Sequence, residues 1–256
     1  KQIMSELILN FKSKVSKKIK NPKNFLGGKG ANLSEMGRMG LPVPPGFTIS
    51  TKVCEIFYKD KKKLNLKLIS QIKKELRSIE KDVSKKFGDL KNPLLLSVRS
   101  GARVSMPGMM DTILNLGLND KTVIALASKT SNGRFAKDSY RRFIQMYSNV
   151  VMGVESYHFE ELIENYKLTK GVLLDTELEE EDWDGLINDF KNTVKEKTSE
   201  EFPQDVYEQL FGAISAVFLS WESNRAKVYR KLNQIPDEWG TAVNVQSMVF
   251  GNMGND

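Results

Sequence analysis

The sequence LLLSVRSGARVSMPGMMDTILNLG, residues 94–117, carries the strongest structural signal in the chain. Its apolar start follows Pro93, which predicts a buried strand that begins at the proline. Arg99 is expected at the end of this strand, because Ser100 and Gly101 break the pattern there. A guanidinium at a strand end, facing a glycine-rich loop, suits a polyanion, since its planar fork matches phosphate oxygens. The segment therefore predicts a bound phosphate group.

The loop after the arginine offers further groups to such an anion. Ser105 and Thr112 carry hydroxyls, and Gly108 can present a backbone N–H. Three methionines lie in the same loop, and we expect them to fill gaps by packing. The alternative is that one of them lines the apolar pocket of a nucleotide base.

The segments on either side predict an α+β fold. Residues 6–11 and 47–49 are expected to be strands, while residues 31–39 and 66–87 have the spacing of helices. Gly40 is a plausible helix stop, and Ser50 or Thr51 can cap the helix that follows the second strand. Near the end of the chain, residues 241–250 alternate like a strand.

The middle of the chain differs in character, because residues 120–205 read almost entirely as helix. Asp205 and Glu208 then have the spacing of a capping box that opens another helix. We expect an α+β subdomain formed by residues 1–118 and 206–256, and a helical subdomain formed by residues 119–205. The chain stops at GNMGND, which is typical of a hairpin turn, so we expect an α+β fold that is incomplete at its C-terminus.

A second anion-binding candidate is the glycine-rich turn Gly27-Gly28-Lys29-Gly30 before the first expected helix. Free backbone N–H groups and the lysine ammonium could converge there on a phosphate. The turn lacks the spacing and the Lys-Ser/Thr pair of a Walker A loop. Taken alone, it favours an ordinary glycine turn with a solvated lysine.

Several other residues with reactive or charged side chains are expected to have structural rather than functional roles. His158 is the only histidine and has no evident partner, so we expect a solvated helix residue. Cys54 is the only cysteine, and its apolar neighbours predict a buried, inert thiol. The acidic run at residues 175–184 lacks the spacing of a calcium loop and reads as a solvated linker. Arg141 and Arg142 are expected on a helix surface.

Composition limits the class of protein. The chain has 256 residues, 40% hydrophobic residues and 28% charged residues, which is ordinary for a globular protein. No apolar run approaches about 18 residues, so we expect no membrane span. The net charge is +7, but the lysines are scattered through helical patterns, which disfavours nucleic-acid binding. A cytoplasmic location is the default expectation.

Three segments together resemble the pyruvate phosphate dikinase family: FLGGKGANLSEMGRMGLPVPPGFTIST, SVRSGARVSMPGMMDTILNLGLND and EWGTAVNVQSMVFGNMG. The resemblance is to the N-terminal part of the family's ATP-binding domain. It implies an ATP-grasp-like nucleotide-binding lobe with a helical insertion. The loop differs from the SSATAEDLPxxSFAGQ pattern that is usual in phosphoenolpyruvate synthases.

The resemblance implies a phosphotransferase that converts ATP, phosphate and pyruvate into AMP, pyrophosphate and phosphoenolpyruvate with Mg²⁺. The phosphoryl group would travel on a phosphohistidine of a central domain of the same polypeptide, and the whole protein would be a homodimer. In the family, the metal-binding carboxylates, a further glycine loop and the phosphohistidine domain come after the position that corresponds to Asp256. We therefore expect this part alone to be inactive and to bind ATP weakly.

The resemblance also assigns roles to individual residues. Lys29 and Arg99 are expected to contact the nucleotide polyphosphate, and Gly108 and Thr112 to belong to the loop that covers it. The remaining candidates lie near the adenine and are Gln246 and Met248. Two alternatives stay open, a phosphoenolpyruvate synthase-like water dikinase and a nucleotide-binding module without catalytic activity.

Overall fold

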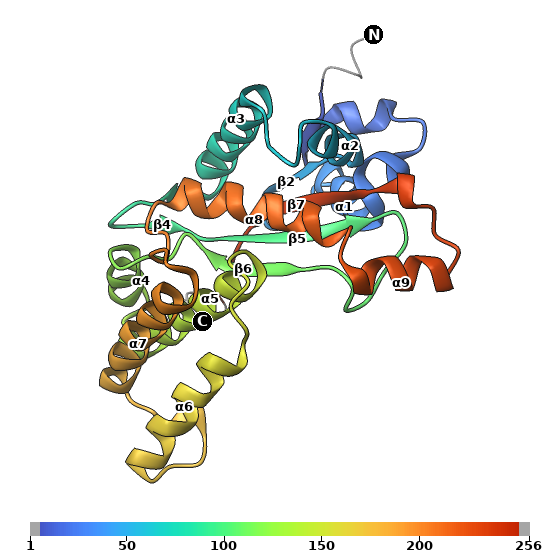
Figure 1. Ribbon diagram of the computed structural model, residues 1–256. Helices are drawn as coiled ribbons and strands as arrows, with labels where there is room; N and C mark the ends of the chain where they lie inside the picture. Colours follow the sequence, from blue (N-terminus) through green and yellow to red (C-terminus); the bar gives the residue numbers. More distant parts are fainter. Residues whose placement is uncertain (1–5, 251–256) are drawn as a thin grey trace. The chain divides into compact units, whose positions relative to one another are not determined.

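A computed structural model describes residues 6–250 as a mixture of helices and mainly antiparallel strands (Figure 1). The first part contains β1 (Ile8–Asn10), the 3₁₀ helix η2 (Lys14–Lys18), α1 (Pro22–Arg38), β2 (Gly46–Ile49), α2 (Thr51–Lys59), α3 (Leu66–Val83), β3 (Lys86–Phe87), β4 (Pro93–Leu94), β5 (Leu96–Ala102) and β6 (Thr112–Leu116). The second part contains α4 (Thr122–Thr130), α5 (Gly133–Val150), α6 (Tyr157–Lys170), η3 (Asp175–Glu177), α7 (Glu180–Thr198), α8 (Val206–Ser220), α9 (Asn224–Leu232), η4 (Asp237–Trp239) and β7 (Thr241–Ser247).

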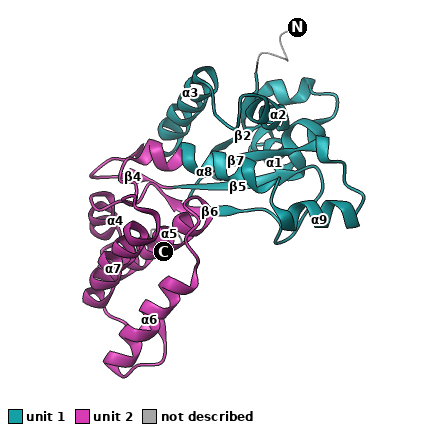
Figure 2. Cartoon of the chain, in the orientation of Figure 1, with its two compact units in different colours: residues 1–84, 96–112, 211–249 teal, residues 85–95, 113–210, 250–256 magenta. Residues whose placement is uncertain are grey.

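The chain divides into two compact units, which Figure 2 shows in different colours. Among the described residues, unit 1 contains residues 6–84, Leu96–Thr112 and Phe211–Val249. Unit 2 contains Lys85–Leu95, Ile113–Leu210 and, as its last described residue, Phe250.

The sheet of unit 1 has strands in the order β1-β2-β7-β5, each antiparallel to its neighbours. Residues aligned across such strands share one face of the sheet. The register aligns Thr48 with Asn244, and Asn244 with Arg99. One face of the sheet therefore carries a row of three polar side chains.

The opposite face of this sheet is apolar. Phe47 is aligned with Val245, and Val245 with Val98, and all three side chains are fully buried. Burial of such side chains stabilises a fold by roughly 1.5–3 kcal/mol each. The alternation of apolar and polar residues in these strands thus separates a core face from a face that can serve a site.

Helix α1 covers the polar face, and its glycines allow close contact with the strands. Gly27 interrupts the helix with a φ of 69°. A Cβ atom there would lie 1.8 Å from the carbonyl oxygen of Gly101, and a Cβ on Gly30 would lie 2.9 Å from Thr48. Only glycine permits this backbone conformation together with this approach.

Several expected helix ends are confirmed. Gly40 follows α1 with a φ of 74° and ends that helix. Ser50 occupies the N-cap position of α2, although its side chain makes no capping hydrogen bond. Asp205 accepts hydrogen bonds from the N–H groups of Tyr207 and Glu208, both at 2.9 Å, at the start of α8.

Several predicted boundaries were wrong. Helix α1 begins at Pro22 rather than at Ala31, so the expected glycine turn at residues 27–30 lies inside it. Strand β7 ends at Ser247 rather than at Phe250. Strand β5 does not end at Arg99 but continues to Ala102, because β7 supplies pairing partners as far as Thr241. Helix α3 ends at Val83 rather than at Phe87, since the residues just beyond it form β3, which pairs with β4. The error in β5 comes from pairing with the distant strand β7, and the error in α3 from pairing with the nearby strand β4. Apolar spacing reports neither pairing.

Unit 2 is helical through α4, α5, α6 and α7, as the sequence predicted. Its core contains Phe143, Trp183 and Phe190, none of which is exposed. The expectation that Arg141 lies on a helix surface was wrong. Its guanidinium is buried, lies 4.7 Å from the ring of Trp183 and is paired with Asp138 at 2.7 Å.

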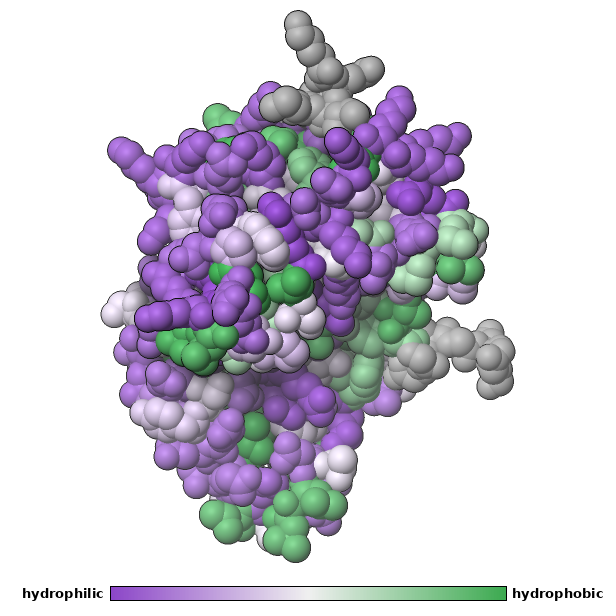
Figure 3. Space-filling model, turned by 90° about the vertical axis from the view of Figure 1, so that its right-hand side faces the viewer, coloured by the Kyte–Doolittle hydropathy of each residue, from purple (hydrophilic) through white to green (hydrophobic). Residues whose placement is uncertain are grey.

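The described surface is mostly hydrophilic on the side drawn in Figure 3, with apolar side chains in small groups. Leu168, Leu173 and Leu174 are the most exposed large apolar residues at the end of α6 and just after it. Between residues 6 and 250, no helix is both long enough and apolar enough to cross a bilayer. The hairpin turn expected at GNMGND lies outside the described residues.

Candidate anion-binding site

The structure brings Lys29 and Arg99 together on the polar side of the unit 1 sheet. Lys29 lies in α1 two residues beyond the break at Gly27, and Arg99 lies within β5. Partial burial and then the charge of Arg99 lower the pKa of Lys29 from its usual 10.5. The two cations are therefore close enough to repel each other.

The two cations lack a counter-charge among the described residues. In that part of the chain, no carboxylate forms an ion pair with Lys29 or Arg99. The Nε atom of Arg99 and the Nδ2 atom of Asn244 are also buried without an acceptor. This face of the sheet thus presents several donors whose charge is not balanced locally.

Such an arrangement is unfavourable unless something binds to it. A buried donor without an acceptor costs about 1–3 kcal/mol, and adjacent like charges add repulsion. An anion with several oxygens would accept from these donors and offset the repulsion. The geometry therefore supports an anion site at Lys29 and Arg99.

Asn244 and Thr48 were missed by the sequence reasoning. Thr48 donates a 2.7 Å hydrogen bond from its hydroxyl to Asn244 Oδ1, and both side chains are buried next to Gly30. The signal that could have found Asn244 is the alternation in VNVQ, which places it on the same face as Gln246. These residues fix the sheet against α1 immediately beside Arg99.

The two candidates near the end of β7 occupy different positions. Gln246 is half-buried, lies on the same sheet face as Arg99 and is aligned with Ser97. Its Nε2 atom donates a 3.1 Å hydrogen bond to the carbonyl oxygen of Pro44. Met248 is half-buried and follows directly after the strand. The fold thus places Gln246 on the face of the candidate site.

The loop after β5 is anchored to helix α9. Arg225 donates from Nε to the carbonyl oxygen of Met109 at 3.2 Å and forms an ion pair with Asp111. Met106 is buried in a cluster with Trp221, and the other loop methionines pack against that cluster. The expectation that these methionines pack is confirmed.

The remaining two candidates, Gly108 and Thr112, are not in direct contact with Lys29 or Arg99 through a hydrogen bond. Gly108 is exposed in the loop with a φ of 72°, and a Cβ added to it would meet no atom within 4 Å. Thr112 is half-buried at the start of β6. The described residues show no hydrogen bond from Gly108 or Thr112 to either cation.

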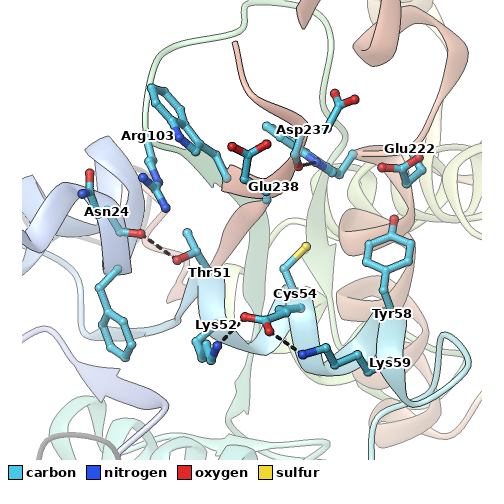
Figure 4. Close-up of a pocket in the computed structure, with 15 residues that line it drawn as sticks. Asn24, Thr51, Lys52, Cys54, Tyr58, Lys59, Arg103, Glu222, Asp237 and Glu238 are labelled. Atoms are coloured by element: carbon cyan, nitrogen blue, oxygen red, sulfur yellow. Dashed lines mark hydrogen bonds and ion pairs between the residues drawn. The ribbon is translucent and has the colours of Figure 1, made fainter.

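A pocket of 870 Å³ lies elsewhere in unit 1 (Figure 4). It is bounded by the first turn of α1, by the whole length of α2, by the residues just after α8, by η4 and by Arg103 just after β5. None of the six predicted site residues lines it. A cavity therefore exists that the anion-site hypothesis does not explain.

The expectation of a linker at residues 175–184 was wrong, because this acidic run forms η3 and the start of α7. Cys54 and His158 behave as expected. Burial raises the pKa of the Cys54 thiol to about 11, so the thiol stays protonated near neutral pH. His158 lies on α6, where its ring is 4.0 Å from that of Tyr157. Across the described ranges, no group of three His, Cys, Asp or Glu side chains is arranged to hold a metal ion.

Comparison with known proteins identifies one family. The family model described as "Pyruvate phosphate dikinase, AMP/ATP-binding domain" matches residues 23–67 and 61–254. The chain is 56% identical over 233 residues to pyruvate, phosphate dikinase of Clostridium symbiosum, and 54% identical over 230 residues to that of Rhizobium meliloti. It is 55% identical over 236 residues to the chloroplastic enzyme of Flaveria pringlei.

These matches cover 91%, 90% and 92% of the chain, respectively. They cover only 27%, 26% and 25% of the three relatives. The chain thus spans about a quarter of the length of these relatives.

Proposed function

The chain belongs to the family of the pyruvate phosphate dikinase AMP/ATP-binding domain, and from that premise we propose that unit 1 holds the polyphosphate of ATP against Lys29 and Arg99. The observation that carries the proposal is the pair of neighbouring cations without a carboxylate partner among the described residues. A bound triphosphate would supply the missing negative charge and the missing acceptors.

The two cations would play different roles. Arg99 would offer a directional fork of donors, and its place within β5 limits its movement. Lys29 would act as a point charge at the start of the helical segment after Gly27, where the helix dipole also favours an anion. Phosphoryl transfer depends mainly on positioning and on stabilising charge, which these groups can provide.

The remaining candidates would complete the nucleotide site. We propose that Gly108 and Thr112 belong to a loop that covers the phosphates, and that Gln246 and Met248 lie near the adenine. On this proposal the fold is an ATP-grasp-like lobe, formed by residues 1–118 and 206–256, with a helical subdomain at residues 119–205.

The whole protein, on the same proposal, converts ATP, phosphate and pyruvate into AMP, pyrophosphate and phosphoenolpyruvate. A phosphohistidine on another domain of the polypeptide would carry the phosphoryl group to pyruvate. The proposed assembly is a homodimer, and the proposed location is the cytoplasm. Mg²⁺ would neutralise phosphate charge in such a reaction. The described residues offer no cluster of metal ligands, so no magnesium ligand is assigned to them.

The pKa of Lys29 provides a test of the site. In the free protein this pKa lies below 10.5, whereas a bound polyphosphate would raise it again by supplying negative charge. At a pH between the lowered pKa and 10.5, binding of ATP should therefore take up a proton, and affinity should fall as pH rises through that window. Calorimetric titration in buffers of different ionisation enthalpy measures this proton uptake.

Lys29→Arg is the matched control, because it keeps the positive charge and removes the group that titrates in this window. The variant should bind ATP without the alkaline proton uptake. Without ligand, the unfolded wild-type chain binds more protons at Lys29 than the folded chain does. The free energy of unfolding should therefore increase as pH rises from the lowered pKa to 10.5. Undiminished proton uptake in Lys29→Arg would assign the titration to another group and remove this support for the site.

A further inference from the structure

The 870 Å³ pocket of unit 1 is lined by charged side chains and by four aromatic residues, namely Phe25, Tyr58, Trp221 and Trp239 (Figure 4). Tyr58 donates its hydroxyl to the carbonyl oxygen of Phe218 at 2.8 Å, and Trp221 donates its ring N–H to that of Asp237 at 3.0 Å. Since these polar atoms are already satisfied, the two rings offer apolar surface to the pocket. The volume lies in the range of small-molecule sites, about 300–1,000 Å³.

Most charged groups on the pocket wall neutralise one another. Three of the four carboxylates are in ion pairs with cations of the pocket wall or just behind it. These pairs are Lys52–Glu55, Lys59–Glu55, Glu222–Arg230 and Asp237–Arg230. Because these charges are already compensated within the protein, they do not favour a charged ligand.

Two opposite charges remain in the pocket, on Arg103 and Glu238. The guanidinium of Arg103 lies 4.9 Å from the ring of Trp239, and its Nε atom is buried without an acceptor. Glu238 is exposed and has no ion pair among the residues that the structure describes. No ion pair joins the two side chains, and Figure 4 shows both on the side of the pocket away from Lys52 and Lys59.

The presence of both a guanidinium and a carboxylate disfavours a simple anion or a simple cation as the ligand of this pocket. An anion held by Arg103 would also face the carboxylate of Glu238, and a cation held by Glu238 would face the guanidinium. A ligand that carries both charges satisfies both groups at once. Apolar walls additionally favour a ligand with a large apolar group.

We propose that this pocket binds a small zwitterion, namely an α-amino acid with an aromatic or large aliphatic side chain. Arg103 binds its carboxylate, and Glu238 binds its ammonium group. The amino-acid side chain packs between the rings of Tyr58, Trp221 and Trp239. The pocket shares no residue with the proposed nucleotide site, so binding here can be tested independently of ATP.

The test is calorimetric titration of the 256-residue chain with L-phenylalanine and two analogues that each lack one charge. These are 3-phenylpropionate, which lacks the ammonium group, and 2-phenylethylamine, which lacks the carboxylate. L-phenylalanine should bind more tightly than both. The expected preference is about tenfold over 2-phenylethylamine, because Arg103 is partly desolvated. It is about threefold over 3-phenylpropionate, because solvent screens Glu238.

Two variants identify the side chains that bind the carboxylate and the ammonium group of the ligand. Arg103→Gln should abolish the preference over 2-phenylethylamine and keep the preference over 3-phenylpropionate, whereas Glu238→Gln should do the reverse. Because each variant keeps one preference, general unfolding cannot imitate the result. Lys129→Gln and Glu181→Gln remove exposed charges of unit 2 and should change neither preference.

Three results would overturn the proposal. The first is that L-phenylalanine does not bind at its solubility limit. The second is equal binding of all three compounds, which would mean that the apolar walls alone hold them. The third is unchanged selectivity in both pocket variants, which would place the site elsewhere.

Discussion

Replacement of Arg99 by methionine is expected to weaken ATP binding by about 2 to 3 kcal/mol, roughly 30- to 150-fold. The variant keeps the apolar length of the side chain and removes the charged fork that would contact the polyphosphate. Calorimetric titration at one fixed salt concentration measures the change. Arg99→Lys keeps a point charge but loses the fork. Its affinity for ATP should therefore lie between that of the wild-type protein and that of Arg99→Met.

The same substitution should leave the fold intact. Arg99 has an unpaired buried Nε atom and lies close enough to Lys29 to lower its pKa, so its removal relieves two unfavourable features. The midpoint of thermal unfolding should stay constant or rise. Arg77→Met removes an exposed arginine of α3 and serves as the control for overall charge. Full ATP affinity together with a lower unfolding midpoint would show that Arg99 is structural.

Replacement of Gly27 by alanine is expected to destabilise unit 1 by about 3 kcal/mol or more. The new Cβ would lie 1.8 Å from the carbonyl oxygen of Gly101, so α1 would have to move away from β5. A left-handed conformation adds about 1–2 kcal/mol for a residue with a side chain. Because Lys29 follows two residues later, ATP affinity should fall as well. Urea unfolding measures the loss of stability.

Gly40→Ala separates the two causes. Gly40 has a φ of 74°, close to the 69° of Gly27, and a Cβ on it would meet no atom within 4 Å. Its free energy of unfolding should therefore fall only by the cost of the left-handed backbone conformation, about 1 kcal/mol. Equal losses in the two variants would show that the contact between α1 and β5 is not tight.

Local pattern predicted much of the secondary structure of this chain and Arg99 of the candidate site, whereas the role of Lys29 depended on the family resemblance. The glycine pattern made Lys29 only a candidate, and the structure places that segment inside α1 rather than before a helix. Arg99 was identified from an apolar run before a loop. Both signals are local, because apolar spacing, glycine and proline act within a few residues. The position of Arg99 within a longer strand was not predicted, since it depends on pairing with β7 about 140 residues away.

Buried polar residues were the main failure of the sequence reasoning. Arg141 looked like a surface residue but stacks on Trp183, and Asn244 looked like an ordinary strand residue but lies buried beside Arg99. Polarity predicts exposure on average, whereas tertiary contacts decide the exceptions. The pocket near Arg103 escaped detection for the same reason, because its wall is assembled from segments far apart in the chain.

The crystal structure of this chain with a non-hydrolysable ATP analogue tests the central claim most directly. The proposal predicts phosphate oxygens within hydrogen-bonding distance of Arg99 and of the Lys29 ammonium, on the polar face of the unit 1 sheet. Phosphates bound instead in the pocket lined by Arg103 and Trp239, with Lys29 and Arg99 left in water, would contradict it.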